Sequence, residues 1–229
     1  ILICQSHLTN NKITQLNILN IKMKTTYDLD HSFNCYQNGE FSKINILKDF
    51  PNKCIVLFFY PYDFTTVCPT EINTMSDKKE QFEELNTEVL LVSNDSIYVH
   101  GAWNQIEREQ KGIKGCTLRM IGDAEKILGK YFDLNESTPV IKNTIHAEHK
   151  NSLSMQNEKN EQNIETVGFY DGNTRRATVI LDKNFSVIHF SIYKNEIGRN
   201  TDEILRIIKM NQLYEKTGKM CECDKGVKQ

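Results

Sequence analysis

Hydrophobic and polar positions in the middle of the chain follow two different periods. Residues 54–60, CIVLFFY, form an unbroken apolar run of strand length, which is typical of a strand buried on both faces of a sheet. From Glu71 the apolar residues recur at helical spacing, residues 88–93 form another buried strand, and residues 96–109 are again helical in pattern. This order of strand, helix, strand and helix predicts an α/β layer with parallel strands.

Two hairpins and a last helix are predicted around this layer. Within residues 32–47, the turn dipeptide Asn38-Gly39 separates two short strands. In residues 176–193, two apolar runs flank Asp182-Lys183-Asn184, which predicts a second hairpin. Residues 202–214 have the apolar spacing of a helix.

Two polar segments interrupt this organisation. Residues of about 140–172 are rich in Asn and Glu and have almost no apolar period, so we expect a surface loop or a disordered insertion. The first 27 residues contain lysine but no acidic residue. They are interpreted either as the remnant of an organelle-targeting segment or as an Asn-rich extension. We therefore expect an intracellular protein, in the cytoplasm or in an organelle such as the mitochondrion.

Charge and composition narrow the class of protein. The 229 residues have a net charge of −2 and a pI near 6.3, so neither nucleic acid nor a membrane is an expected partner. The seven cysteines are odd in number and scattered, which indicates a reducing compartment rather than a disulfide scaffold. Cys35, Cys54 and Cys116 lie among apolar residues and are predicted to be core thiols.

Cys68 stands where the first buried strand has ended and a helix is about to begin. A thiol in the first turn of a helix faces unpaired backbone N–H groups and the positive end of the helix dipole, and both favour the reactive thiolate. Pro69 suits this position because its missing N–H costs nothing there. The structural alternative is a capping or core cysteine.

Two known uses of such a cysteine do not fit. A phosphatase loop needs an arginine six residues after the cysteine, and here that residue is Thr74. A C-x-x-C dithiol needs a cysteine where this chain has Glu71. Any partner thiol must come from a distant part of the sequence.

The segment FFYPYDFTTVCPTEI, with its pattern Pro61-x-x-x-Thr65-x-x-Cys68, resembles the typical two-cysteine peroxiredoxins. The resemblance extends to residues 92–103, 176–182 and 197–208. It implies a thioredoxin-like α/β fold, with a central mixed sheet flanked by helices and an extended C-terminal arm. The expected domain spans residues 28–208, and the arm spans 209–229.

The resemblance also implies roles for individual residues. Cys68 would be the peroxidatic cysteine, whose thiolate attacks a peroxide oxygen and becomes a sulfenic acid. Thr65 would bring its hydroxyl to the thiolate and the peroxide, and Pro61 would shield the sulfenic acid. Arg176 would be the catalytic arginine, Glu71 would orient it, and Arg199 would be a second arginine near the site. An ordinary surface ion pair is the alternative for the charged residues.

In this branch of the family, a resolving thiol from the partner subunit follows the last helix. Cys221 stands at that position and is the expected resolving thiol, but the chain continues with Glu222 and Cys223 where the family usually has Pro, so Cys223 stays open as the alternative. A metal-binding C-x-C end is the alternative, although no nearby His or further Cys completes a site. We expect neither a cofactor nor a metal.

The resemblance implies a peroxidase for hydrogen peroxide and organic hydroperoxides, recycled by thioredoxin or a similar dithiol. It also implies homodimers, which in the family assemble into rings of five dimers. Two alternatives stay open at this stage. One is a holdase or peroxide sensor that passes oxidation to client proteins, and the other is a one-cysteine enzyme whose tail thiols play no part.

Overall fold

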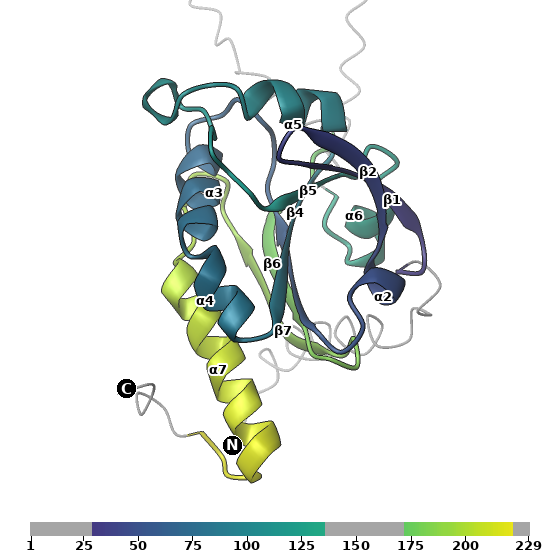
Figure 1. The fold of residues 1–229 in the computed structure, drawn as a ribbon, viewed down its shortest axis with the longest axis vertical. Coiled ribbons are helices and arrows are strands. Elements are labelled where there is room, and N and C mark those ends of the chain that lie inside the picture. The colour runs from purple at the N-terminus through teal and green to yellow at the C-terminus, as the bar shows by residue number, and fades with distance from the viewer. Residues whose placement is uncertain (1–28, 136–171, 222–229) are drawn as a thin grey trace, which may run out of the picture.

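A single mixed sheet of seven strands forms the centre of the protein (Figure 1). The computed structural model describes residues 29–135 and 172–221 of the chain. The strand order is β2-β1-β5-β4-β3-β6-β7. The strands are β1 (Ser32–Gln37), β2 (Glu40–Asn45), β3 (Cys54–Phe59), β4 (Thr87–Ser93), β5 (Arg119–Gly122), β6 (Arg176–Leu181) and β7 (Val187–Tyr193).

Helices cover both faces of this sheet, as Figure 1 shows. They are α2 (Ile46–Asp49), α3 (Cys68–Asp77), α4 (Lys79–Glu84), α5 (Ile97–Trp103), a 3-10 turn (Arg108–Gln110), α6 (Ile127–Tyr131) and α7 (Thr201–Thr217). The predicted α/β class with a mixed sheet flanked by helices is confirmed.

The parallel centre of the sheet arises from the apolar runs. β3 pairs in parallel with β4, and β4 pairs in parallel with β5. All six residues of β3 are buried, as its continuous apolar sequence predicts. Strand β5 and helix α6 were not predicted, because four and five residues are too few to show a period.

Both predicted hairpins are confirmed. β1 and β2 pair antiparallel, and Asn38 and Gly39 between them have positive φ angles of 51° and 87°. That conformation requires residues such as Asn and Gly, which explains the strength of the sequence signal. β6 and β7 pair antiparallel across the Asp182-Lys183-Asn184 turn.

Two helices differ from their predicted bounds. The helix expected from Glu71 begins three residues earlier, at Cys68, and a break at Lys78 separates it into α3 and α4. The helix expected over residues 96–109 ends at Trp103, so α5 has seven residues. Its beginning follows from Ser96, whose side chain accepts a hydrogen bond from the Val99 amide as an N-cap.

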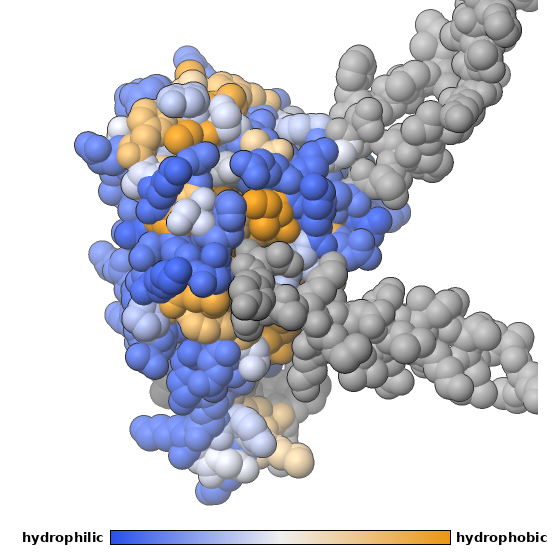
Figure 2. Space-filling model, turned by 90° about the vertical axis from the view of Figure 1, so that its right-hand side faces the viewer, coloured by the Kyte–Doolittle hydropathy of each residue, from blue (hydrophilic) through white to orange (hydrophobic). Residues whose placement is uncertain are grey.

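Buried side chains form one layer on each face of the sheet. On the face that α3, α4 and α7 cover, side chains such as Phe58, Ile72 and Ile208 pack together. On the other face, Phe59 and Phe132 belong to a second buried layer. Figure 2 shows the side of the molecule at the right of Figure 1, where hydrophobic residues gather in small groups between hydrophilic ones. Such small groups are ordinary for a folded surface.

The predicted thiols of the core are all buried. Cys35, Cys54 and Cys116 expose 0%, 7% and 2% of their surface. The N-terminal extension, most of the predicted polar insertion and Cys223 lie outside the described residues. Helix α7 runs without a break through residue 208, where the arm was expected to begin, so the described part of the arm beyond the helix is residues 218–221.

Candidate active site

Cys68 opens helix α3 at the end of the loop that follows β3. Pro69 occupies the first turn, and no side-chain oxygen caps the amides of that turn. The cysteine is 1% exposed. The predicted junction of strand and helix therefore places a buried thiol at the positive end of a ten-residue helix.

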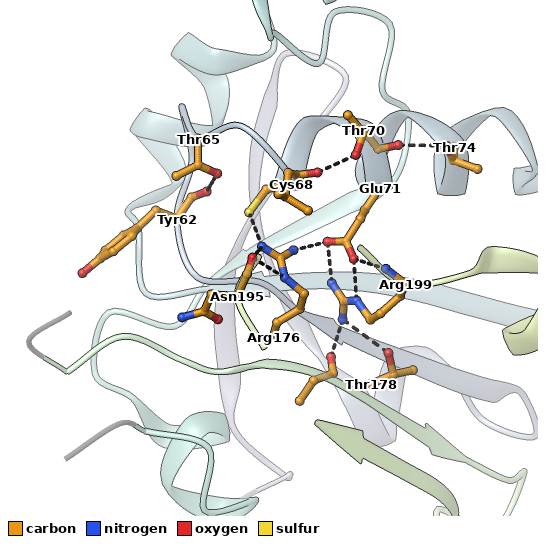
Figure 3. A network of polar contacts seen from close by, with 12 residues as sticks. Tyr62, Thr65, Cys68, Thr70, Glu71, Thr74, Arg176, Thr178, Asn195 and Arg199 are labelled. Atoms are coloured by element: carbon orange, nitrogen blue, oxygen red, sulfur yellow. Dashed lines mark hydrogen bonds and ion pairs between the residues drawn. The ribbon is translucent and has the colours of Figure 1, made fainter. Parts of the chain in front are cut away.

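Arg176 reaches this thiol from the first position of β6. Its Nη2 lies 3.5 Å from the Cys68 sulfur (Figure 3). The backbone carbonyl of Asn195 accepts two further bonds from Arg176, from Nη2 at 2.8 Å and from Nε at 3.2 Å. Arg176 is 2% exposed, so its guanidinium is fixed from two sides and largely removed from water.

Glu71 joins Arg176 to a second arginine. Glu71 lies one helical turn after Cys68 and forms an ion pair with Arg176 Nη1. Its carboxylate also accepts from Arg199 Nε at 2.9 Å, from Arg199 Nη2 at 3.0 Å and from the Arg199 amide at 2.7 Å. Glu71 thus neutralises one of two buried cations and orients both.

Arg199 is held on its other side by the sheet. Its Nη1 donates to the Ala177 carbonyl at 2.6 Å, and its guanidinium carbon lies 3.3 Å from the centre of the Phe58 ring. Burial lowers the pKa of Arg199, and Glu71 opposes that effect. The alternative of ordinary surface ion pairs is wrong for Glu71, Arg176 and Arg199, because none of the three is more than 9% exposed.

A cavity of 340 Å³ lies in front of the thiol, and Pro61, Thr65, Cys68, Arg176, Asn195 and Glu196 are among the residues that line it. The Thr65 hydroxyl donates to the Tyr62 carbonyl at 3.1 Å. Thr65 therefore lines the pocket as expected, with its hydroxyl turned to the backbone in this state. The space suits a small molecule that reaches the sulfur and the arginine together.

Four of the predicted site residues, Pro61, Thr65, Cys68 and Arg176, line this pocket, Glu71 contacts it through Arg176, and Cys221 lies elsewhere. Its thiol is exposed and donates to the Met210 carbonyl at 3.4 Å, on α7. Gln212, on the same part of α7, donates to the Leu85 carbonyl at the end of α4. Cys221 therefore lies against the part of α7 that contacts the end of α4, whereas Cys68 begins α3, which alone is about 15 Å long. Figure 1 shows α3, α4 and α7 on the same side of the sheet.

The sequence analysis gave no role to Asn195 and Glu196, the two pocket residues that follow β7. Asn195 acts through its backbone carbonyl, and a main-chain oxygen leaves no signal in the sequence. Glu196 lines the pocket from the same loop after β7. The sequence signal that could have indicated Glu196 is its position, two residues before the Gly198-Arg199 pair.

Other kinds of site were searched for within residues 29–135 and 172–221. There, no three His, Cys, Asp or Glu side chains are grouped so that they could hold a metal ion. None of the helices in that part of the chain combines the length and apolar character that a membrane crossing requires.

The sheet and the site together define a protein of thioredoxin-like fold with a buried cysteine at the start of a helix. Residues 28–190 match the AhpC/TSA family. The chain is 34% identical over 184 residues to the mitochondrial thioredoxin-dependent peroxide reductase of Mus musculus, covering 80% of this chain and 59% of that protein. It is 33% identical over 182 residues to the chloroplastic 2-Cys peroxiredoxin BAS1 of Hordeum vulgare, covering 80% of this chain and 71% of the relative.

A solved structure agrees with these sequence matches. The reduced 2-Cys peroxiredoxin of Plasmodium vivax superposes with a TM-score of 0.68 at 30% identity, over 87% of this chain and 86% of the other. The chain therefore belongs to the AhpC/TSA family, as a typical two-cysteine peroxiredoxin.

Proposed function

We propose that this protein is a thiol peroxidase that reduces hydrogen peroxide and organic hydroperoxides at Cys68. The observation that carries the proposal is the 3.5 Å approach of Arg176 to the buried Cys68 sulfur at the end of a small pocket. The relatives named as peroxide reductases and peroxiredoxins support the same activity. They do not favour the alternative of a holdase or sensor.

In the first step, the Cys68 thiolate attacks one oxygen of the peroxide. A sulfur–oxygen bond forms, the O–O bond breaks, and the other oxygen leaves with a proton as water or alcohol. Negative charge moves from sulfur to the leaving oxygen as the bond breaks. Arg176 is the fixed cation at that place, and Glu71 and the Asn195 carbonyl hold it there before the substrate arrives.

In the second step, a thiol attacks the Cys68 sulfenic acid, a disulfide forms and water leaves. We assign this thiol to Cys221 of a partner subunit, with Cys223 as the alternative. A disulfide requires Cα atoms within about 7 Å, and the two ends of the α3–α4 pair are much further apart. A homodimer, or a ring built from dimers, follows from this assignment.

Reduction of the disulfide by thioredoxin or a similar dithiol completes the cycle. The name of the mouse relative supports thioredoxin as this partner. The relatives named as mitochondrial and chloroplastic support an organelle as the location, and imaging of the natural protein decides between an organelle and the cytoplasm.

The test is peroxide consumption with thioredoxin and its reductase. Wild-type protein should turn over, and Cys68→Ser should lose at least about a thousandfold in rate. Cys116→Ser is the matched control, since it removes a buried thiol that does not line the pocket and should keep the activity. Equal rates in wild type and Cys68→Ser would refute the proposal.

A non-reducing gel after one equivalent of peroxide tests the second step. Wild type should give a covalent dimer, and Cys221→Ser should remain monomeric on the gel. A dimer that persists in Cys221→Ser and disappears in Cys223→Ser assigns the role to Cys223 instead. A dimer that is lost in neither single variant and lost in the double variant makes the two thiols interchangeable.

A further inference from the structure

The pocket holds one charge that no partner compensates. Glu196 lines the cavity and is exposed, and it takes part in no ion pair with the described residues. The other charged groups at the site are Arg176, Arg199, Glu71 and, in its reactive form, the Cys68 thiolate. These four are two cations and two anions in direct contact, so their charges cancel.

Arg176 does not offset Glu196, because its positive charge already faces the Glu71 carboxylate and the Cys68 thiolate. Nη1 is bound to Glu71, Nη2 to the Cys68 sulfur and the Asn195 carbonyl, and Nε to the same carbonyl. Lys194 is exposed nearby but does not line the cavity. A molecule entering the pocket therefore passes a net negative charge before it reaches the thiolate.

We propose that Glu196 is a specificity-determining residue that makes the pocket select neutral peroxides over anionic ones. This inference rests on the proposed peroxidase function and adds the class of substrate to it. Hydrogen peroxide and uncharged alkyl hydroperoxides carry no charge at neutral pH and are not repelled. A hydroperoxide that carries a carboxylate is repelled by the Glu196 side chain as it enters the pocket.

The expected size of the effect follows from Coulomb's law. Two unit charges about 8 Å apart at a half-exposed site repel each other enough to slow the reaction by a few-fold to about tenfold. Salt weakens the repulsion, because the screening length falls from about 10 Å at 0.1 M to about 3 Å at 1 M. The discrimination should therefore shrink as the salt concentration rises.

The experiment compares substrates that differ only in charge. A short tertiary hydroperoxide with a carboxylate and its methyl ester form the pair, and hydrogen peroxide serves as the baseline. The second-order rate of Cys68 oxidation is measured by rapid quenching, alkylation and mass spectrometry. In wild type, the ester should react about 3- to 10-fold faster than the acid.

In Glu196→Gln, the ratio of ester to acid should approach one, mainly because the acid reacts faster, and the rate with hydrogen peroxide should stay within twofold. Glu196→Lys should invert the ratio. Glu80→Gln on α4 is the matched control, since it removes an equal, exposed charge that does not line the pocket. It should leave the ratio unchanged.

Two outcomes overturn the inference alone. One is a ratio that Glu196→Gln does not alter, and the other is an equal change in Glu80→Gln, which would reveal an effect of net charge. In both cases hydrogen peroxide still oxidises Cys68, so the proposed function stands. A wild-type protein in which Cys68 reacts with none of the three peroxides overturns the function and the inference together.

Discussion

Cys68 and Cys221 are the two thiols that the proposed cycle joins, and their surroundings are opposite. Cys68 is 1% exposed and lies against Arg176 in a network of fixed charges. Cys221 is exposed beyond α7, where its thiol donates to a carbonyl of that helix. In the proposed cycle, the reaction with peroxide uses charges that are already in place, whereas a partner thiol reaches the buried Cys68 only if the first turn of α3 opens. The proposed cycle therefore needs fixed charges in its first step and movement of the helix in its second.

Breaking the charge network around Cys68 should have the largest effect. Glu71→Gln keeps the shape of the side chain and removes the negative charge that Arg176 and Arg199 share. Because two buried cations then lack a carboxylate, the free energy of unfolding should fall by about 3–5 kcal/mol, measured by urea denaturation. Glu203→Gln, which breaks an exposed pair with Arg206, should cost less than about 1 kcal/mol. Equal losses in the two variants would contradict a structural role for the network.

Removing the positive charge of Arg176 should slow the reaction of Cys68 with peroxide. Arg176→Ala should slow the oxidation of Cys68 by about 100- to 1,000-fold, because a preorganised donor to the moving charge is lost. The loss should persist when the pH is raised to 10, which separates charge stabilisation from ionisation of the thiol. Arg119→Ala is the control, since Arg119 pairs with Glu88 outside the pocket. A loss of only severalfold at high pH would make the assignment of Arg176 wrong.

Cys35 and Cys54 are buried thiols outside the pocket, and they show how burial alone changes the pKa of a thiol. Burial raises the pKa of Cys35 and of Cys54 from 9.0 to about 11. Well below pH 9, both thiols are protonated in the folded and in the unfolded chain. Between pH 9 and 11, they lose their protons in the unfolded chain but keep them in the folded chain. Stability is therefore fully present below pH 9 and falls by about 3 kcal/mol per thiol as the pH rises through 11.

Urea denaturation at pH 8 and pH 11 measures this loss. The Cys35 thiol of the folded state is about half ionised at pH 11, so the loss should be about 2 kcal/mol smaller in Cys35→Ala than in wild type. Cys221→Ala should show the full loss, because Cys221 is exposed. The same loss in Cys35→Ala as in wild type would show that Cys35 is not the source.

The smallest effect is expected at Asn195. Arg176 is bound to the backbone carbonyl of this residue, so Asn195→Ala removes the side chain and keeps both hydrogen bonds. The rate of Cys68 oxidation should change by less than about twofold. A loss as large as that of Arg176→Ala would mean that the Asn195 amide itself takes part.

Much of the fold could be predicted because its signals are local. The apolar run of β3 and the Asn38-Gly39 turn each lie within a few residues, and both predictions are confirmed. β5 and α6 are too short to show a period, and the end of α5 at Trp103 depends on tertiary packing. Local pattern alone does not give these features.

The candidate site also combines features that the local sequence predicts with features that it does not. The position of Cys68 at a helix start follows from its own neighbours in the sequence. Its contacts with Arg176 and Glu71's contacts with Arg199 join residues 108 and 128 positions apart, and no local rule predicts them. The resemblance to the peroxiredoxins implied that Arg176 and Arg199 lie near Cys68, and the contact between Glu71 and Arg199 was not predicted. The Asn195 carbonyl was not expected at all.

That carbonyl has a consequence for how this protein can change over evolutionary time. Every amino acid supplies a main-chain oxygen, so position 195 can mutate while Arg176 stays anchored. The neighbouring side chain of Glu196 lines the pocket and makes no contact that holds the arginine. Adjacent residues of this loop therefore differ in what they contribute: Asn195 anchors Arg176 through its backbone, and Glu196 lines the pocket through its side chain. If the proposed roles hold, a substitution at position 196 changes the selection of substrates while the backbone of the loop keeps Arg176 in place.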